Sequence, residues 1–364
     1  MLVCVTGGTG FVGAHSVAAL VRAGCRVRLL ARDAALAAVA LGPLGVDADA
    51  VQVLTGDVRD PVAVRAAVRG ADAVLHAASV YSFDSRLARQ VRAVNVRGTE
   101  VVLEAALEAG VRRTVHVSSV VALFPARSRV VDQHSPAGGA RETYMASKSA
   151  AEEVARRYQA EGAPVVITYP PALLGPDDPH CGDQSSRLRD TLRGLMPLWP
   201  LGGFPLGDVR DTARLHALLL DGSLPGENRV FGPGRYLTTS QYLSVLREVT
   251  GRPLPTGFLP GRAMLPVGLL ADRVQRYWPW HIPAQYGAVY TCVCATRVSG
   301  RAPTGGITAR PTAETMTDAV RWLHRSGRLS ARQAGTAARP GAGGRAGGPA
   351  GADVPAEPAG GERL

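Results

Sequence analysis

The pairing of Tyr144 with Lys148 is the part of the sequence best suited to chemistry. Of the 41 lysine and arginine residues in the chain, Lys148 is the only lysine. Arginine supplies charge on a surface, but its forked guanidinium is a poor substitute for a compact ammonium beside a phenol. Four residues apart on a helix, the two side chains share a face, so the ammonium favours the ionised phenol. The spacing therefore predicts that Tyr144 donates or accepts a proton and has a lowered pKa.

A glycine-rich turn near the start of the sequence is typical of a dinucleotide site. Residues 2–6 form a short apolar run that predicts a strand, and residues 14–23 predict a helix. The turn between them has the spacing G-x-x-G-x-x-G, from Gly7 through Gly10 to Gly13. The first glycine permits a tight turn, the second lets the backbone approach a pyrophosphate, and the third allows close packing of helix on strand. The N-terminus of the helix would then face the phosphates.

The end of the second predicted strand, residues 26–30, bears on the choice of cofactor. A free ribose 2′-hydroxyl requires an acidic residue here, whereas an arginine accommodates a 2′-phosphate. Ala31 occupies the position, and Arg32 and Asp33 follow it. The sequence therefore favours NADP(H). NAD(H) is the alternative, because Asp33 is close and Arg32 could equally be a solvated surface residue.

Later strand ends bring small and polar residues to the same edge of the predicted sheet, where doubly wound sheets bind ligands. Asp57 follows the apolar run 51–54 and could accept a hydrogen bond from an adenine amino group. Ala77 and Ala78 leave room for the ribose and nicotinamide, while His76 is expected to be structural. The alternatives are a turn-forming aspartate and ordinary small packing residues.

Seven motifs in this order resemble the extended branch of the short-chain dehydrogenase/reductase superfamily, the NAD-dependent epimerase/dehydratase family. The resemblance spans about residues 1–327 and is strongest to dihydroflavonol-reductase-like and 3β-hydroxysteroid-dehydrogenase-like bacterial members. It implies an α/β fold, a doubly wound parallel Rossmann sheet with a smaller C-terminal substrate-binding cap. The motifs are Thr6-Gly7-Gly8-Thr9-Gly10-Phe11-Val12-Gly13, Gly56-Asp57-Val58, His76-Ala77-Ala78, Asn95-Val96-Arg97-Gly98-Thr99, Ser118-Ser119, Tyr144 with Lys148, and Pro170-Pro171-Ala172-Leu173-Leu174-Gly175-Pro176.

The resemblance implies a role for each matched residue. Tyr144 is implied to be the general acid and base, Lys148 to hold the nicotinamide ribose, and Ser119 to donate to the substrate oxygen. Asn95 completes the catalytic set by bracing the site from the central helix. Tyr169 replaces the arginine often found before the first proline of the last motif, so a contact from that arginine is not expected. The residues expected to bind the cofactor are Gly7, Thr9, Gly10, Phe11, Val12, Gly13, Arg32, Asp57, Val58, Ala77, Ala78, Ser79, Tyr144, Lys148, Pro170 and Leu173, the last through its backbone.

Alternation of predicted strands and helices defines the expected domains. It continues through residues 1–175 and implies a parallel Rossmann sheet with right-handed crossovers. Residues 176–206 are rich in proline and predict a cap segment, residues 207–235 a return to the sheet, and residues 236–330 a substrate-binding cap. Residues 331–364 are mostly Ala, Gly, Pro and Arg, which predicts a disordered tail.

Composition excludes several other classes of protein. The net charge is +11, but the arginines are scattered and aromatic residues make up only 5%, so no nucleic-acid partner is expected. The five cysteines are odd in number and include no pair of CxxC motifs, so neither a disulfide framework nor a metal site is expected. No apolar run is long enough for a transmembrane segment, although residues 264–270 and 278–295 are apolar enough to touch a membrane surface. Without a secretory signal, these features predict a cytoplasmic protein acting on a small molecule. The resemblance also suggests a homodimer.

Aromatic residues near the predicted site favour an apolar substrate. Tyr81 and Phe83 follow the fourth strand, and Trp199 lies in the first cap segment. If these rings line the pocket, an apolar ketone or secondary alcohol fits better than a nucleotide sugar. The alternative is that the cap rings fill its own small core, above all Trp278 and Trp280.

The leading hypothesis is an NADP(H)-dependent oxidoreductase that transfers a hydride between the nicotinamide and a ketone or secondary alcohol, with Tyr144 passing the proton. A sugar-nucleotide epimerase or dehydratase with retained NAD is the alternative, because Arg187, Arg189 and Arg193 could face a diphosphate. A non-catalytic NADP(H)-sensing regulator is a second alternative. The Tyr144 and Lys148 pair argues against a regulator, which has no need of proton transfer.

Overall fold

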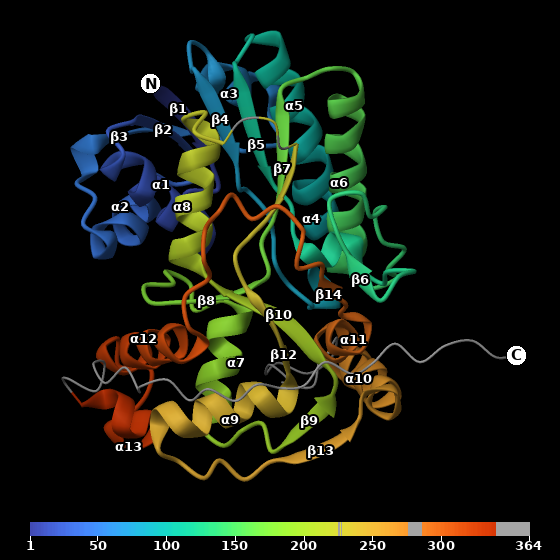
Figure 1. Cartoon of the computed structure of the whole chain (residues 1–364). Helices are drawn as coiled ribbons and strands as arrows, with labels where there is room; N and C mark the ends of the chain where they lie inside the picture. Colours follow the sequence, from blue (N-terminus) through green and yellow to red (C-terminus); the bar gives the residue numbers. More distant parts are fainter. Residues whose placement is uncertain (225, 227, 276–285, 340–364) are drawn as a thin grey trace, which may run out of the picture.

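The computed structural model describes residues 1–224, 226, 228–275 and 286–339, and it has two parts (Figure 1). The larger part is a seven-stranded sheet in the order β11-β7-β5-β4-β1-β2-β3, in which every neighbouring pair is parallel. The sheet grows in opposite directions from β1, which creates the switch point where such sheets bind ligands. The expected Rossmann sheet is confirmed. Its strands are β1 (Leu2–Thr6), β2 (Arg26–Ala31), β3 (Val51–Thr55), β4 (Ala73–His76), β5 (Arg113–Val117), β7 (Val165–Tyr169) and β11 (Arg229–Phe231).

Helices cover both faces of this sheet, which explains why its central strands are buried and mostly apolar. Every residue of β4 and β7 is buried. Each fully buried valine or leucine contributes about 1.5–3 kcal/mol to folding, so the two apolar faces hold the helices in place. One face carries α1 (Phe11–Arg22), α2 (Ala35–Leu41) and α8 (Val209–Leu220), and the other carries α3 (Pro61–Val68), α4 (Ala88–Arg92), α5 (Gly98–Glu108) and α6 (Thr143–Ala160). Shorter helical turns are η1 (Gly42–Leu44), η2 (Ala48–Ala50), η3 (Ser85–Leu87), η4 (Ala93–Arg97) and η5 (Val120–Leu123).

The smaller part is the cap, which lies beyond the carboxyl ends of the large sheet (Figure 1). A core of aromatic and aliphatic side chains joins most of its helices to two of three small sheets. The cap helices are α7 (Asp183–Leu192), α9 (Thr239–Thr250), α10 (Gly261–Gln275), α11 (Tyr286–Cys294), α12 (Thr312–Arg325), α13 (Ala331–Ala334) and the turn η6 (Gly335–Ala338). The small sheets are β12 (Arg235–Thr238), β10 (Gly203–Asp208) and β8 (Ala172–Leu174); β13 (Gly257–Pro260) with β9 (Leu198–Leu201); and, at the junction, β14 (Arg297–Val298) with β6 (Val130–Val131).

A buried charge cluster joins the two parts where β10 leads into α8. Asp208 caps α8 by accepting a hydrogen bond from the Arg210 N–H, and its carboxylate also accepts from Thr315 of α12. The Arg210 guanidinium lies 2.7 Å from the carboxylates of both Asp208 and Asp318. Because a buried charge needs partners, this cluster ties a helix of the large sheet to a helix of the cap.

Two segments are arranged differently from the expected domain division. Within residues 207–235, only α8 and β11 belong to the large sheet, since β10 and β12 pair in a small one. Residues 331–338, expected to be disordered, form α13 and η6, and this part of the tail prediction is wrong. Small alanines at 334 and 337 are buried in the cap core, so the helical turns are held by packing that composition does not reveal. Residues 340–364 lie outside the described part of the chain.

In the described residues, no helix has both the length and the apolar character that crossing a bilayer requires.

Candidate active site

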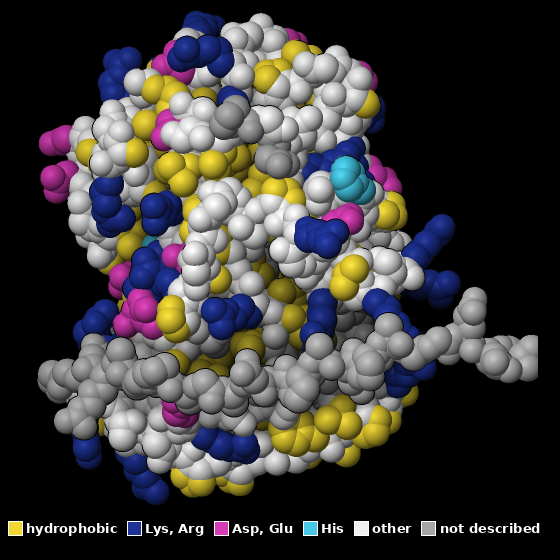
Figure 2. All heavy atoms as spheres, in the orientation of Figure 1, with side chains coloured by type: hydrophobic (Ala, Val, Ile, Leu, Met, Phe, Trp, Pro, Cys, Tyr) yellow, Lys and Arg dark blue, Asp and Glu magenta, His cyan; other side chains and the backbone are white. Residues whose placement is uncertain are grey.

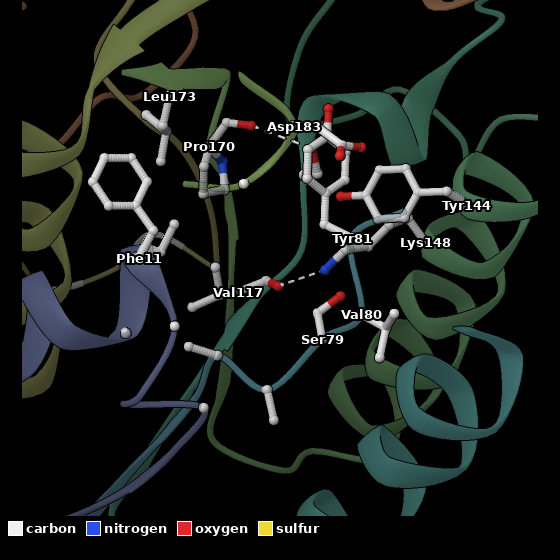
Figure 3. Close-up of a pocket in the computed structure, with 18 of the residues that line it drawn as sticks. Phe11, Ser79, Val80, Tyr81, Val117, Tyr144, Lys148, Pro170, Leu173 and Asp183 are labelled. Carbon is white, nitrogen blue, oxygen red and sulfur yellow. Dashed lines mark hydrogen bonds between the residues drawn. The ribbon is translucent and has the colours of Figure 1, made fainter. Parts of the chain in front are cut away.

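A cavity of about 440 Å³ lies between the carboxyl edge of the sheet and the cap. Every residue expected to bind the cofactor lines it, from the glycine turn to Leu173. Tyr144 and Lys148 meet Tyr81 in its wall, although Tyr81 comes from a separate segment of the chain (Figure 3). Ser119 and Phe83 line the same cavity. The fold thus brings the sequence motifs into one place.

The glycine turn forms a cradle that fits a pyrophosphate. A Cβ atom at Gly13 would lie 2.1 Å from the Gly7 carbonyl oxygen, and one at Gly7 would lie 2.4 Å from the Ala78 nitrogen, so both positions require glycine for packing. At Gly10, a Cβ would meet only the Gly7 oxygen at 3.4 Å, so a side chain there would occupy the cavity instead. The following helix α1 has no side-chain cap and no acidic residue in its first turn. Its free N–H groups and positive dipole end suit an anionic group.

The other end of the cradle carries Arg32 and Asp57, both in the cavity wall. Asp57 is already engaged, because Arg59 lies 2.7 Å from its carboxylate. The hydrogen bond from Arg59 is the main reason that the pKa of Asp57 is lowered. Arg32 is exposed, and no ion pair joins it to another described residue, so its guanidinium is available to a ligand.

Tyr144 stands at the start of α6 in an apolar corner of the cavity. Glu142 caps this helix by accepting hydrogen bonds from the N–H groups of Tyr144 and Met145. The rings of Tyr81 and Phe83 contact the Tyr144 ring edge to face, with centroids 4.7 and 5.8 Å away. Burial raises the pKa of Tyr144 well above its usual value, and Tyr81 and Glu142 add to the shift. Tyr144 therefore remains a neutral phenol at neutral pH.

Lys148 lies one turn further along α6, and its Nζ donates to the Val117 carbonyl at 3.3 Å (Figure 3). Burial lowers its pKa to about 8. The ammonium of Lys148 thus points to the end of β5. A hydrogen bond with Ser119 lowers the pKa of Tyr144, but burial raises that pKa by more. Burial is the largest effect on the pKa of Tyr144 in this structure, and a lowering of that pKa by Lys148 stays a prediction.

Asn95 lies behind the cavity wall and does not line it. It sits in η4, a turn of π-helix, a geometry often found at functional sites. Its Oδ1 accepts hydrogen bonds from the Val80 N–H at 2.7 Å and from the Ser79 hydroxyl at 3.1 Å, and its Nδ2 donates to Ser147 at 2.9 Å. Asn95 thus braces the loop after β4 against α6 and acts as a positioning residue.

Trp199 does not line the cavity. It is 1% exposed and packs against Tyr242 in the core of the cap, with ring centroids 5.5 Å apart. Trp278 and Trp280 lie outside the described residues. The expectation of a pocket role for Trp199 is wrong because β9 turns this ring towards α9, whereas Phe204 of β10 does reach the cavity.

Of the three arginines considered for a diphosphate, only Arg187 lines the cavity. Arg189 forms an ion pair with Asp190 at 2.8 Å, and Arg193 donates to the Arg328 carbonyl. Of these three arginines, the cap therefore presents one to a diphosphate in the cavity.

Several functional features escaped sequence analysis. Gln184 of α7 donates a hydrogen bond to the Tyr81 hydroxyl at 3.1 Å and so connects the cap to the large domain over the site.

Below the site, the His116 ring stacks on the His76 ring, with ring centroids 5.4 Å apart. His76 bonds Thr6 and Thr99, but neither ring nitrogen of His116 has a partner among the described residues. In the sequence, the polar His76 and His116 near the ends of two apolar strands were the available signal for this histidine pair.

Comparisons with known proteins agree with this geometry. The model of the NAD dependent epimerase/dehydratase family matches residues 3–231. The chain is 32% identical to sterol demethylase protein B of Methylococcus capsulatus, over 78% of this chain and 85% of that protein. It is 31% identical to the 4-hydroxy-2-methyl-3-oxo-4-farnesyl-3,4-dihydroquinoline-1-oxide ketoreductase of Stigmatella aurantiaca, over 75% of this chain and 80% of that protein.

A solved structure with NAD bound also resembles this fold. The dTDP-glucose 4,6-dehydratase DesIV of Streptomyces venezuelae matches with a TM-score of 0.67 and 25% identity, covering 90% of this chain and 98% of that one. The family expected from the motifs is thereby confirmed. This chain belongs to the NAD dependent epimerase/dehydratase family, whose members are NAD(P)-dependent oxidoreductases, epimerases and dehydratases.

Proposed function

We propose that this protein is an NADP(H)-dependent reductase of an apolar ketone. The observation that carries the proposal is a neutral, buried Tyr144 beside Ser119 and Lys148 in a cavity shared with the glycine cradle. The bound nicotinamide would supply the hydride. The residues of this chain would bind and orient both ligands and supply the proton.

Tyr144 would donate its phenolic proton to the carbonyl oxygen. Because its pKa is raised, Tyr144 carries its proton at neutral pH, as a proton donor must before the transfer. Ser119 would donate a hydrogen bond to the same oxygen and stabilise the charge that develops there. Lys148, buried and still largely protonated at pH 7, would bind the ribose and return a proton towards Tyr144.

NADP(H) is favoured because of the charge at the end of β2. Arg32 lines the cavity, and the position before it, where a 2′-hydroxyl would need an acidic partner, is Ala31. The nearby Asp57 carboxylate is neutralised by Arg59, so it would not repel a phosphate strongly.

An apolar substrate is favoured by the side chains around Tyr144. Val80, Tyr81, Phe83, Val121 and Phe204 supply apolar surface to the cavity. Two relatives of this chain are named for a sterol and for a farnesyl-substituted compound. Nucleotide-sugar turnover remains the second candidate, supported by Arg187 in the cavity wall and by the dehydratase fold.

Replacement of Tyr144 by phenylalanine tests the proposal. A general acid contributes about 100- to 10,000-fold to a rate, so Tyr144→Phe should lose at least 100-fold in NADPH-dependent ketone reduction. Its affinity for NADPH, titrated by tryptophan fluorescence, should stay within a factor of two or three of the unmodified protein's, because the phenol contributes little to nucleotide binding. Tyr158→Phe, on the same helix but outside the cavity, is the matched control and should keep its activity.

Two results would contradict the proposal. Ketone reduction by Tyr144→Phe at the rate of the control would remove the tyrosine from the reaction. Tightly retained NAD⁺ together with turnover of a nucleotide sugar would favour the second candidate.

A further inference from the structure

The cap has an exposed apolar surface formed by β9, β13 and α10. Of the fifteen large hydrophobic residues that are exposed in the described part of the chain, seven lie on these elements and an eighth, Leu195, lies in the loop before β9. Figure 2 shows hydrophobic side chains gathered at the lower end of the molecule, over the region of β9 and β13. We refer to these residues as the apolar cap surface: Leu195, Leu198, Leu201, Leu259, Val267, Leu269, Leu270 and Val274.

Local packing explains why these residues face solvent. The strands β9 and β13 pair in parallel, with Trp199 opposite Phe258 on the face that joins the cap core. Leu198 and Leu259, at alternating positions, therefore lie on the outer face. On α10, a Cβ at Gly268 would lie 2.8 Å from the Tyr286 Cα. The glycine side of α10 thus packs on α11, and its larger apolar residues remain outside.

Two arginines of α10 lie on its exposed side. Arg262 and Arg273 are both exposed, and neither forms an ion pair with a described residue. They are eleven residues apart, which is about three helical turns, so they lie on one line along the helix. Leu270 and Val274 lie beside this line at 62% and 42% exposure. A basic line next to an apolar stripe is the pattern of a helix that lies in a membrane interface.

We propose that the apolar cap surface docks this protein on an anionic lipid bilayer, with α10 lying in the interface. The negative potential of an anionic leaflet attracts Arg262 and Arg273, while the leucines enter the boundary between headgroups and acyl chains. A second copy of this chain is a poorer occupant, since pairing two such surfaces would bring arginines of like charge together. The net charge of +11 acts in the same direction.

Docking through α10 would bring the cavity close to the bilayer. It packs on α11, whose Thr291 and Cys292 line the cavity. A single helix therefore separates the lipid from the wall of the site. An apolar molecule dissolved in the bilayer would have a short route to the cavity, although the docking itself does not depend on the proposed reaction.

Vesicle partitioning of the full chain tests the proposal without any need for turnover. Flotation would compare vesicles of phosphatidylcholine and phosphatidylglycerol with vesicles of phosphatidylcholine alone. The double variant V267S/L270S should partition at least about tenfold more weakly into the mixed vesicles, because one valine and one leucine side chain no longer leave water. V39S/L107S is the matched control, since Val39 and Leu107 are exposed to similar extents, 61% and 49%, but lie on helices of the large domain.

A second variant addresses the charge separately. R262Q/R273Q should lose about fivefold in binding for each arginine on the mixed vesicles and little on neutral ones. Circular dichroism at the assay temperature would verify that every variant is folded. These substitutions lie on exposed positions, so at least one of the two pairs is expected to fold.

Three results would overturn the proposal. The unmodified protein could fail to float with the mixed vesicles. V267S/L270S could bind them as well as V39S/L107S does. Light scattering could instead reveal a dimer that only V267S/L270S disrupts, and then a second copy of the chain covers this surface.

Discussion

Lowering the pH from 8 to 5 should destabilise this protein through three histidines buried against the sheet. His76, His116 and His216 are all at most 2% exposed. Burial lowers the pKa of His76 and of His216 to about 3, and that of His116 well below its ordinary value. The hydroxyls near the ring nitrogens of His216, Ser16 at 2.9 Å and Thr168 at 3.2 Å, are uncharged, so burial decides the shift.

The sign and size of the effect follow from proton linkage. In the unfolded chain a histidine titrates near pH 6.5, so below that pH the unfolded chain binds protons that the folded protein does not. The contribution of these histidines to the free energy of unfolding is therefore fully present above about pH 6.5. It is lost as the pH falls from there towards their lowered pKa values in the folded protein. At pH 5, about 1.5 units below the unfolded pKa, each histidine costs about 2 kcal/mol. Three together cost about 6 kcal/mol, comparable with the whole stability of an ordinary domain, and the buried His15, whose pKa burial lowers to about 4, adds about 2 kcal/mol more.

Urea unfolding followed by tryptophan fluorescence at pH 8, 7, 6 and 5 measures this loss. The variant His116→Leu serves as an internal test, because the His116 ring nitrogens have no partner among the described residues and leucine has a similar volume. It should reduce the loss between pH 8 and 5 by about a quarter, since four buried histidines share it, and leave stability at pH 8 nearly unchanged. Equal urea midpoints at pH 8 and pH 5 for the unmodified protein would refute the reasoning, as would a His116→Leu variant with the same pH dependence.

Four substitutions test the site itself. Gly10→Ala should keep its melting temperature within a few degrees, because the added Cβ meets protein only at 3.4 Å, but should weaken NADPH binding at least about tenfold in a fluorescence titration; an unchanged Kd would contradict the cradle. Arg32→Ala should lose about tenfold in affinity for NADPH and little for NADH, since a charged hydrogen bond contributes about 1.5–3 kcal/mol, and equal losses would count against the phosphate contact. Trp199→Ala should cost about 3–5 kcal/mol of unfolding free energy without changing the substrate KM of the folded fraction. Arg187→Ala should leave the KM for an apolar ketone within about twofold, whereas a rise above tenfold for a nucleotide sugar would support the second candidate.

Local patterns were enough to predict the sheet and the residues of the cofactor cradle. The spacing from Gly7 to Gly13 specifies a turn by backbone geometry alone, and the four-residue spacing of Tyr144 and Lys148 specifies a shared helix face. Strand ends could be placed at one edge because parallel strands with crossover helices all point the same way. In each case the relevant interaction lies between residues close in sequence or within one repeating unit.

What the sequence could not decide depended on which distant segments became neighbours. The pKa of Tyr144 rises because Tyr81 and Phe83 of another loop exclude water from it. Trp199 faces the cap core and not the cavity because of its pairing with Tyr242, forty-odd residues further along the chain.

By itself, then, the sequence determined the fold family, the glycine cradle and the tyrosine and lysine pair, since these depend on backbone geometry and short-range periodicity. Only the tertiary structure decided the protonation of that pair, the partners through which Asn95 braces the site and the order of residues 331–338. It also left an apolar surface uncovered on the cap. Burial and desolvation are properties of the assembled chain, and they arise from contacts that no local pattern specifies.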